Sequence, residues 1–144
     1  MSETYEVNLR RVALGGLAGG AVWSIWNAVV NLWILAGRYE AAGEGGRLMI
    51  EPRYPFFLPA SYVMLFVLSG VIAWLYASVR ATRGPGPLTA LIVGFLVGFA
   101  AGFPVNFYVV SLIEVDKLFP LWWMLDLWLG AMLAALVAAW VYRD

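Results

Sequence analysis

Residues 88–113 read LTALIVGFLVGFAAGFPVNFYVVSLI, an apolar run without a single charged side chain. A membrane-spanning helix needs roughly 20 mainly apolar residues, so this run is long enough to cross a bilayer. Three further runs of this kind cover residues 11–36, 57–79 and 121–141. Together they predict an all-α integral membrane protein, a four-helix bundle that forms one domain over residues 1–144. Residues 37–56 are expected to form an external loop, with no helix at its glycine-rich centre.

The composition limits the classes of protein to which this chain can belong. Hydrophobic residues make up 63% of the 144 residues and charged residues only 12%, whereas soluble domains carry about 25% charged residues. The formal net charge is zero and the basic residues are scattered, which gives no footprint for nucleic acid. Cysteine and histidine are both absent, so the usual ligands of haem, zinc and iron–sulfur clusters are missing. We therefore expect no cofactor and no metal.

The basic residues favour one orientation in the membrane. Four spans place both termini on one side, next to five arginines, whereas the opposite side has four basic residues balanced by acidic ones. The positive-inside rule then predicts cytoplasmic termini in a multi-pass protein of a bacterial inner membrane. The five arginines are Arg10, Arg11, Arg80, Arg83 and Arg143.

Rows of small residues at four-residue spacing mark one face of each predicted helix. In lipid, helices associate mainly through close backbone approach at such residues, so these rows predict the mutual packing faces. The packing residues expected from them are Gly15, Gly19, Gly94, Gly98, Gly102, Gly130 and Ala134.

The first and third helices share a pattern at a constant offset. Gly15, Gly19 and Asn27 each have an identical residue 79 positions later, in the third helix. Matching helices run in the same direction across the membrane. This pattern suggests two parallel helix hairpins related by an axis along the membrane normal, although such identities also arise by chance in glycine-rich helices.

Polar residues end these rows at a similar depth below the external surface, and we predict that they form one polar layer inside the bundle. The layer is expected to contain Asn27, Asn31, Ser61, Asn106 and Asp126. Asp126 is the only formal charge well inside a span, and an intramembrane carboxylate is a functional-site hypothesis by default. The alternative is purely structural, because amides and hydroxyls commonly join membrane helices through hydrogen bonds.

Motifs of known catalytic chemistry are missing from the sequence. It contains no phosphate-binding loop, no zinc-ligand spacing and no Gly-x-Ser-x-Gly motif. Asp126 also lacks a convincing second group for acid–base catalysis. We therefore expect no enzymatic activity.

Two segments carry a resemblance to a known family. Residues 76–80, YASVR, and 84–90, GPGPLTA, together with RVALGGLAGG at 11–20, resemble a family of small bacterial four-helix inner-membrane proteins with no assigned function. The resemblance covers about a third of the chain. Since its motif is a helix end and a turn, it implies a fold and no chemistry.

Two functions remain open on the sequence alone. The first is a non-catalytic accessory or scaffold subunit, surrounded by membrane lipid within a homo-oligomer or among other membrane protein subunits. The second is a small-solute or ion channel or transporter that uses the Asn/Asp polar layer. Asp126→Asn separates them, because only the second function needs the carboxylate.

Overall fold

The structure is a computed structural model that describes residues 6–143, and the regular structure over that range is entirely helical. Four of its helices are long and apolar enough to cross a membrane. This confirms the predicted all-α four-helix bundle and makes the chain a multi-pass integral membrane protein. The elements are α1 (Leu9–Val29), the π-helix η1 (Val30–Ile34), α2 (Ala36–Glu44), α3 (Phe57–Arg83), α4 (Pro87–Leu112) and α5 (Leu118–Val141).

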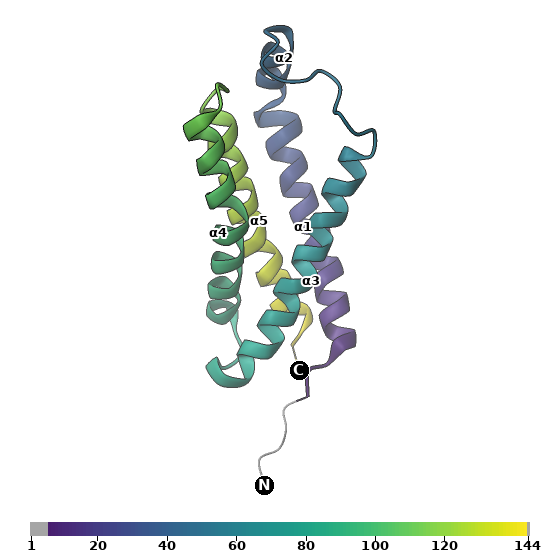
Figure 1. The fold of residues 1–144 in the computed structure, drawn as a ribbon. Helices are drawn as coiled ribbons and strands as arrows, with labels where there is room; N and C mark the ends of the chain where they lie inside the picture. Colours follow the sequence, from purple (N-terminus) through teal and green to yellow (C-terminus); the bar gives the residue numbers. More distant parts are fainter. Residues whose placement is uncertain (1–5, 144) are drawn as a thin grey trace.

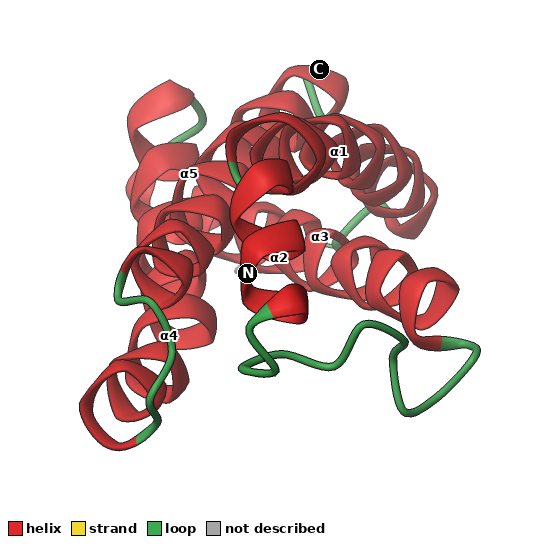
Figure 2. Ribbon diagram, turned by 90° about the horizontal axis from the view of Figure 1, so that it is seen from above, coloured by secondary structure: helices red, strands yellow, loops and turns green. Residues whose placement is uncertain are grey.

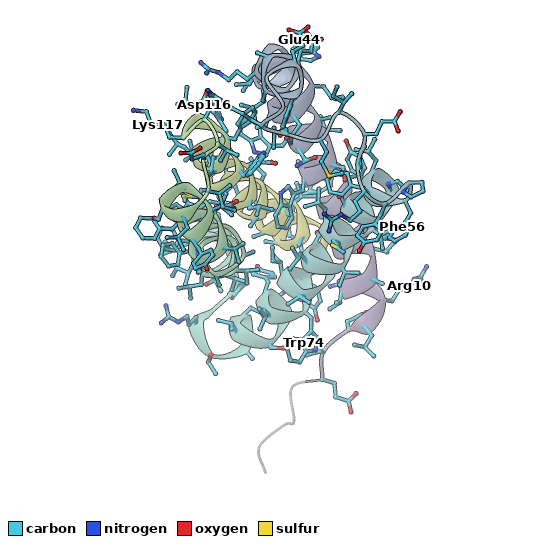
Figure 3. The ribbon with its side chains drawn as sticks, turned by 45° about the horizontal axis from the view of Figure 1, so that its top comes forward. Arg10, Glu44, Phe56, Trp74, Asp116 and Lys117 are labelled. Carbon is cyan, nitrogen blue, oxygen red and sulfur yellow. The ribbon has the colours of Figure 1, made fainter. Side chains whose placement is uncertain are left out.

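The four spans pass up and down around α5. This helix packs against α4 and α1 over much of its length and against α3 to a smaller extent, while α1 also packs along α3. The start of α1 and the end of α5 lie at one end of the bundle, which we call the terminal end, and α2 lies at the other, the α2 end (Figure 1). Seen from above, α2 lies over the middle of the bundle (Figure 2). Glu44, Asp116 and Lys117 lie toward the α2 end, and Trp74 lies toward the terminal end (Figure 3).

Two glycine rows bring α5 into close contact with helices on both sides. A Cβ atom on Gly19 of α1 would lie 2.8 Å from the carbonyl oxygen of Ala134, and one on Gly94 of α4 would lie 2.7 Å from the Cα of Met132. Such distances leave no room for a side chain. On α5 itself, Gly130 receives the indole of Trp23, which lies 2.1 Å from the position of a Cβ there. The residues expected at packing faces, Gly15, Gly19, Gly94, Gly98, Gly102, Gly130 and Ala134, are all buried.

The connection between the first two spans differs from the sequence prediction. Residues 37–56 were expected to form a loop, but the chain continues as α2 up to Glu44. The prediction was wrong for this first part because good helix formers (alanine, glutamate and arginine) make up five of residues 37–44 and outweigh Gly37 and Gly43. The helix ends where two further glycines follow, Gly45 at the C-cap and Gly46 with a φ of +66°.

Two spans also extend beyond their apolar runs, one at the terminal end and one at the α2 end. The second span continues from the expected end at residue 79 to Arg83, because helix can extend beyond the hydrocarbon when its last turn carries arginines. The third span matches its expected range closely, and the fourth begins three residues early, at Leu118. The suggested internal duplication stays a prediction.

A π-turn separates α1 from α2. The backbone N–H of Leu35 donates to the carbonyl of Val30, five residues back, at 2.9 Å. This wider turn lies just after Asn27 and includes Asn31. Because π-turns change the angular phase of the residues that follow, this turn helps to decide which side of α2 faces the bundle.

Candidate functional site

Asp126 lies in the interior of the bundle and is bound from α1. Its side chain is only 2% exposed. The side-chain amide of Asn27 donates to Oδ2 of Asp126, and the amide of Asn31 donates to the same oxygen at 3.3 Å. The indole N–H of Trp26 donates to the backbone carbonyl of Asp126 at 3.2 Å. Three polar groups of the first span, two from α1 and one from η1, therefore converge on one residue of α5.

Two aromatic residues extend this network toward α2. The hydroxyl of Tyr39 donates to Oδ1 of Asn31 at 2.7 Å and accepts a hydrogen bond from Nε1 of Trp123, also at 2.7 Å. The amide of Asn31 further donates to the backbone carbonyl of Asn27 at 2.9 Å, within the irregular part of the helix. We call these five residues, Asn27, Asn31, Tyr39, Trp123 and Asp126, the Asp126 cluster.

An aromatic layer at the α2 end accompanies the cluster. Phe119, which is 1% exposed, stacks against the ring of Tyr39 at 4.9 Å and against Trp123 at 5.8 Å. Val30 and Leu35 are fully buried in the same small core. Tyr39 also lines a hollow of about 450 Å³, between α2 and residues 48–50. Its ring therefore belongs both to the buried cluster and to a surface cavity.

An ion pair holds α2 over the bundle. Nη1 of Arg38 lies 2.8 Å from Oδ2 of Asp116, in the link between α4 and α5. The backbone N–H of Leu118 donates to the other carboxylate oxygen at 3.0 Å. These contacts, the Leu118 bond first, hold the pKa of Asp116 below its ordinary value. Because both ionic side chains are substantially exposed, we regard the pair as a positioning contact rather than a large source of stability.

The two oxygens of the Asp126 carboxylate have different surroundings. Oδ2 accepts from two amides, whereas Oδ1 is buried and has no hydrogen-bond partner among residues 6–143. A buried polar atom without a partner is unusual and calls for an explanation. A proton bound to Oδ1, or a small cation beside it, would compensate for the missing hydrogen-bond partner.

The structure brings together only three of the five residues expected in the polar layer: Asn27, Asn31 and Asp126. Ser61 and Asn106 do not join them. The hydroxyl of Ser61 donates to the carbonyl of Phe57 at 2.7 Å, and the amide of Asn106, though buried, donates to the carbonyl of Gly102 at 2.7 Å. Both bonds stay within one helix. For Ser61 the geometry gives the reason, because the start of α3 leans away from α4 and α5 (Figure 1).

Sequence reasoning missed Tyr39 and Trp123. The available signal for Trp123 was its position three residues before Asp126, which places both on one face of a helix. Tyr39 gave a weaker signal, because it was assigned to a loop and its orientation depends on the π-turn at Val30–Ile34.

The pKa of Tyr39 is raised above its ordinary value of 10.0, first because burial disfavours the phenolate and also because Asp126 is nearby, while the bond from Trp123 acts in the opposite direction. The folded state therefore holds the phenolic proton more tightly than the unfolded state. The resulting stability is fully present below pH ~10 and is lost as pH rises through the folded pKa.

When the pH is raised from ~8 to ~11, we expect the free energy of unfolding to fall less for Tyr39→Phe than for the wild type. Unfolding in detergent micelles at the two pH values measures this difference. The matched control is Tyr54→Phe, because Tyr54 is exposed in the connection after α2. The control should follow the wild-type pH profile. An unchanged alkaline decline in Tyr39→Phe would contradict this interpretation of the Tyr39 environment.

Comparison of the chain with protein-family models, with curated proteins and with solved structures found no match. The resemblance to small bacterial four-helix inner-membrane proteins therefore stays a prediction. Within residues 6–143 no three histidine, cysteine, aspartate or glutamate side chains gather in a group that could hold a metal ion. The features of the protein that bear on its function are therefore the Asp126 cluster and the surfaces of the helices.

Proposed function

We propose that this protein is a non-catalytic accessory or scaffold subunit of a homo-oligomer or of a larger membrane complex. The observation that carries the proposal is the inward bonding of Asp126. Its carboxylate is almost completely buried and binds two amides of the first span, Asn27 in α1 and Asn31 in η1. Such an arrangement joins α1 to α5 inside the bundle, as expected of polar groups that hold membrane helices together.

The packing below the Asp126 cluster also supports a structural role. On the side toward the terminal end, Trp23 lies against Gly130, and Gly19 lies against the backbone of Ala134. On the other side of α5, a Cβ on Gly98 would lie 2.8 Å from the Cβ of Ala131. A solute route from the cluster through the middle of a single bundle would have to separate these contacts.

The outer surface of α4 and α5 offers a rigid aromatic face. Trp128 makes edge-to-face contacts with Phe95 at 5.0 Å and with Phe103 at 5.3 Å, and Phe99 stacks on Phe103 at 4.8 Å. Aromatic side chains that already hold one another lose little freedom when a partner binds. We therefore propose this face as the seat of another membrane helix, either from a second copy or from another subunit, with lipid covering the remaining surface.

We also propose a cellular setting and an orientation for the protein. We place the protein in a bacterial inner membrane with the terminal end toward the cytoplasm. The support for this orientation is the excess of arginine next to the termini and the balance of acidic and basic residues at the α2 end.

One observation favours a second candidate, an ion or small-solute pathway. Oδ1 of Asp126 lacks a hydrogen-bond partner among the described residues, and intramembrane carboxylates commonly mark proton or cation routes. Tyr39 connects this cluster to the hollow of about 450 Å³ near the α2 end. A pathway of this kind would need helix movement or an oligomer to continue to the terminal end.

The variant Asp126→Asn distinguishes the two candidates. Its matched control is Asp116→Asn, which also removes a carboxylate at the α2 end, but an exposed one. For the scaffold, we expect Asp126→Asn to change stability by no more than about 1 kcal/mol, because its amide oxygen can still accept from Asn27. Proton and sodium flux into proteoliposomes should stay at background for the wild type and both variants. The wild type should purify in mild detergent as a homo-oligomer or with a stoichiometric partner.

Two results would contradict the scaffold. The first is wild-type flux that disappears in Asp126→Asn and persists in Asp116→Asn, which would establish the pathway instead. The second is a wild-type protein that stays monomeric in lipid nanodiscs and co-purifies with no other chain.

A further inference from the structure

A second cavity lies at the terminal end of the bundle, away from the Asp126 cluster. It is a hollow of about 650 Å³ between the end of α3, the start of α4 and the end of α5. This volume lies within the usual range of ligand sites, about 300–1,000 Å³. Two arginines, Arg80 and Arg143, are among the described residues that line it.

Contacts within the protein hold Arg80 in this wall. The residue is only 8% exposed. Its Nη1 donates to the backbone carbonyl of Tyr142 at 2.7 Å, and its guanidinium carbon lies 5.0 Å from the centre of the Tyr142 ring. A guanidinium held in this way keeps its positive charge at a fixed place before a ligand arrives, which lowers the entropic cost of binding.

The turn between α3 and α4 shapes the opposite wall. Gly84 and Gly86 have φ values of +86° and +140°, which favour glycine. The N–H of Gly86 donates to the hydroxyl of Tyr76 at 3.2 Å, and the hydroxyl of Thr89 donates to the carbonyl of Gly84 at 2.9 Å. The turn is therefore ordered, and it directs the positive end of the α4 dipole toward the hollow.

The hollow lies at the level of lipid headgroups. Arg80 is in the last turn of α3, and Arg143 lies two residues beyond the end of α5, so both residues are at the boundary of the spans. Leu136 and Trp140 of α5 continue the wall toward the membrane interior, and Trp140 is 65% exposed. Such a wall suits a molecule that has an anionic head and an apolar tail.

We propose that this hollow binds the phosphate headgroup of an anionic phospholipid between α3, α4 and α5. The phosphate oxygens would accept from Arg143 beside the fixed positive charge of Arg80, and an acyl chain would lie along Leu136 and Trp140. Basic pockets between membrane helices are known to bind the headgroups of anionic lipids. Free phosphate shares the headgroup chemistry but makes no use of the apolar wall, which favours the lipid.

The test is lipid binding to the purified protein in mild detergent, measured by native mass spectrometry. Phosphatidylglycerol, phosphatidylcholine and inorganic phosphate are the three probes. Phosphatidylglycerol should bind at least about fivefold more tightly than phosphatidylcholine, and inorganic phosphate at the same concentration should not displace it. Arg143→Gln should weaken phosphatidylglycerol binding about fivefold, as expected when a direct guanidinium–phosphate contact worth about 1 kcal/mol is lost.

Arg83→Gln is the matched control, because Arg83 is an exposed arginine at the same end of α3 and is not part of the described wall. Its phosphatidylglycerol affinity should stay within about twofold of the wild type. Arg80→Lys keeps the charge but loses the guanidinium contacts that fix it, so it should weaken binding, while the lipid-free thermal stability reports whether the variant still folds. The proposal is overturned if Arg143→Gln and Arg83→Gln behave alike, if phosphatidylcholine binds equally well, or if inorganic phosphate competes.

Discussion

Replacing Gly94 by alanine is expected to lower the free energy of unfolding by about 3 kcal/mol, the upper part of the usual range for overpacking. The added Cβ would lie 2.7 Å from the Cα of Met132 and 2.8 Å from the carbonyl oxygen of Ala131. Both are backbone atoms of α5, so a rotamer change cannot relieve the contact. The helices must move apart along the interface at which the row continues through Gly98 and Gly102. Reversible unfolding in mixed micelles with increasing SDS measures the change.

The matched control for this prediction is Gly70→Ala. Gly70 lies in the middle of α3, and an added Cβ there meets nothing within 4 Å. Helix propensity alone makes this substitution neutral or slightly stabilising, by up to about 1 kcal/mol. If both variants shift the unfolding curve equally, the α4–α5 interface is not as close as the structure has it.

Replacing Asp126 by alanine is expected to lower the free energy of unfolding by about 2 kcal/mol, because it removes the shared acceptor of two amide donors. Hydrogen bonds between membrane helices are worth about 0.6–1.7 kcal/mol each, and two of them end on Oδ2 of Asp126. A double-mutant cycle with Asn27→Ala isolates one bond. It should give a coupling energy of about 1 kcal/mol.

A second cycle provides the control, with Asn106→Ala in place of Asn27→Ala. Asn106 is buried, but its amide bonds to Gly102 of its own helix. Its coupling to Asp126→Ala should be below about 0.3 kcal/mol. A strong coupling of Asn106 to Asp126, or none for Asn27, would show that the polar residues are grouped differently.

The fold was largely predictable because the bilayer imposes a simple length rule. A run such as 88–113 must be helical in lipid, where each backbone polar group needs an internal partner. The small-residue rows were informative for a related reason, since Gly19 and Gly94 allow an approach that any side chain would prevent. The helix in 36–44 was missed because it lies outside the apolar runs, where the length rule does not apply.

The candidate site was predictable only in part. Asn31 and Asp126 lie at matching depths, and Asn27 is one turn from Asn31 in the same row, so spacing was enough to group them. Depth alone also selected Ser61 and Asn106, whose side chains bond within their own helices. Whether such a group reaches a neighbouring helix depends on local separation and tilt, and the sequence pattern contains neither quantity.

The π-turn at Val30–Ile34 puts one extra residue into the connection that leads from α1, through a bend at Leu35, to α2. Each residue advances an α-helix by about 100°, so a related chain lacking this insertion would turn α2 by that angle about its axis. Tyr39 would then leave Asn31 and Phe119, and a different side of α2 would lie over the bundle. We therefore expect a related chain with one residue fewer between positions 30 and 35 to lack the hydrogen bonds through which the Tyr39 hydroxyl connects the first span to the last.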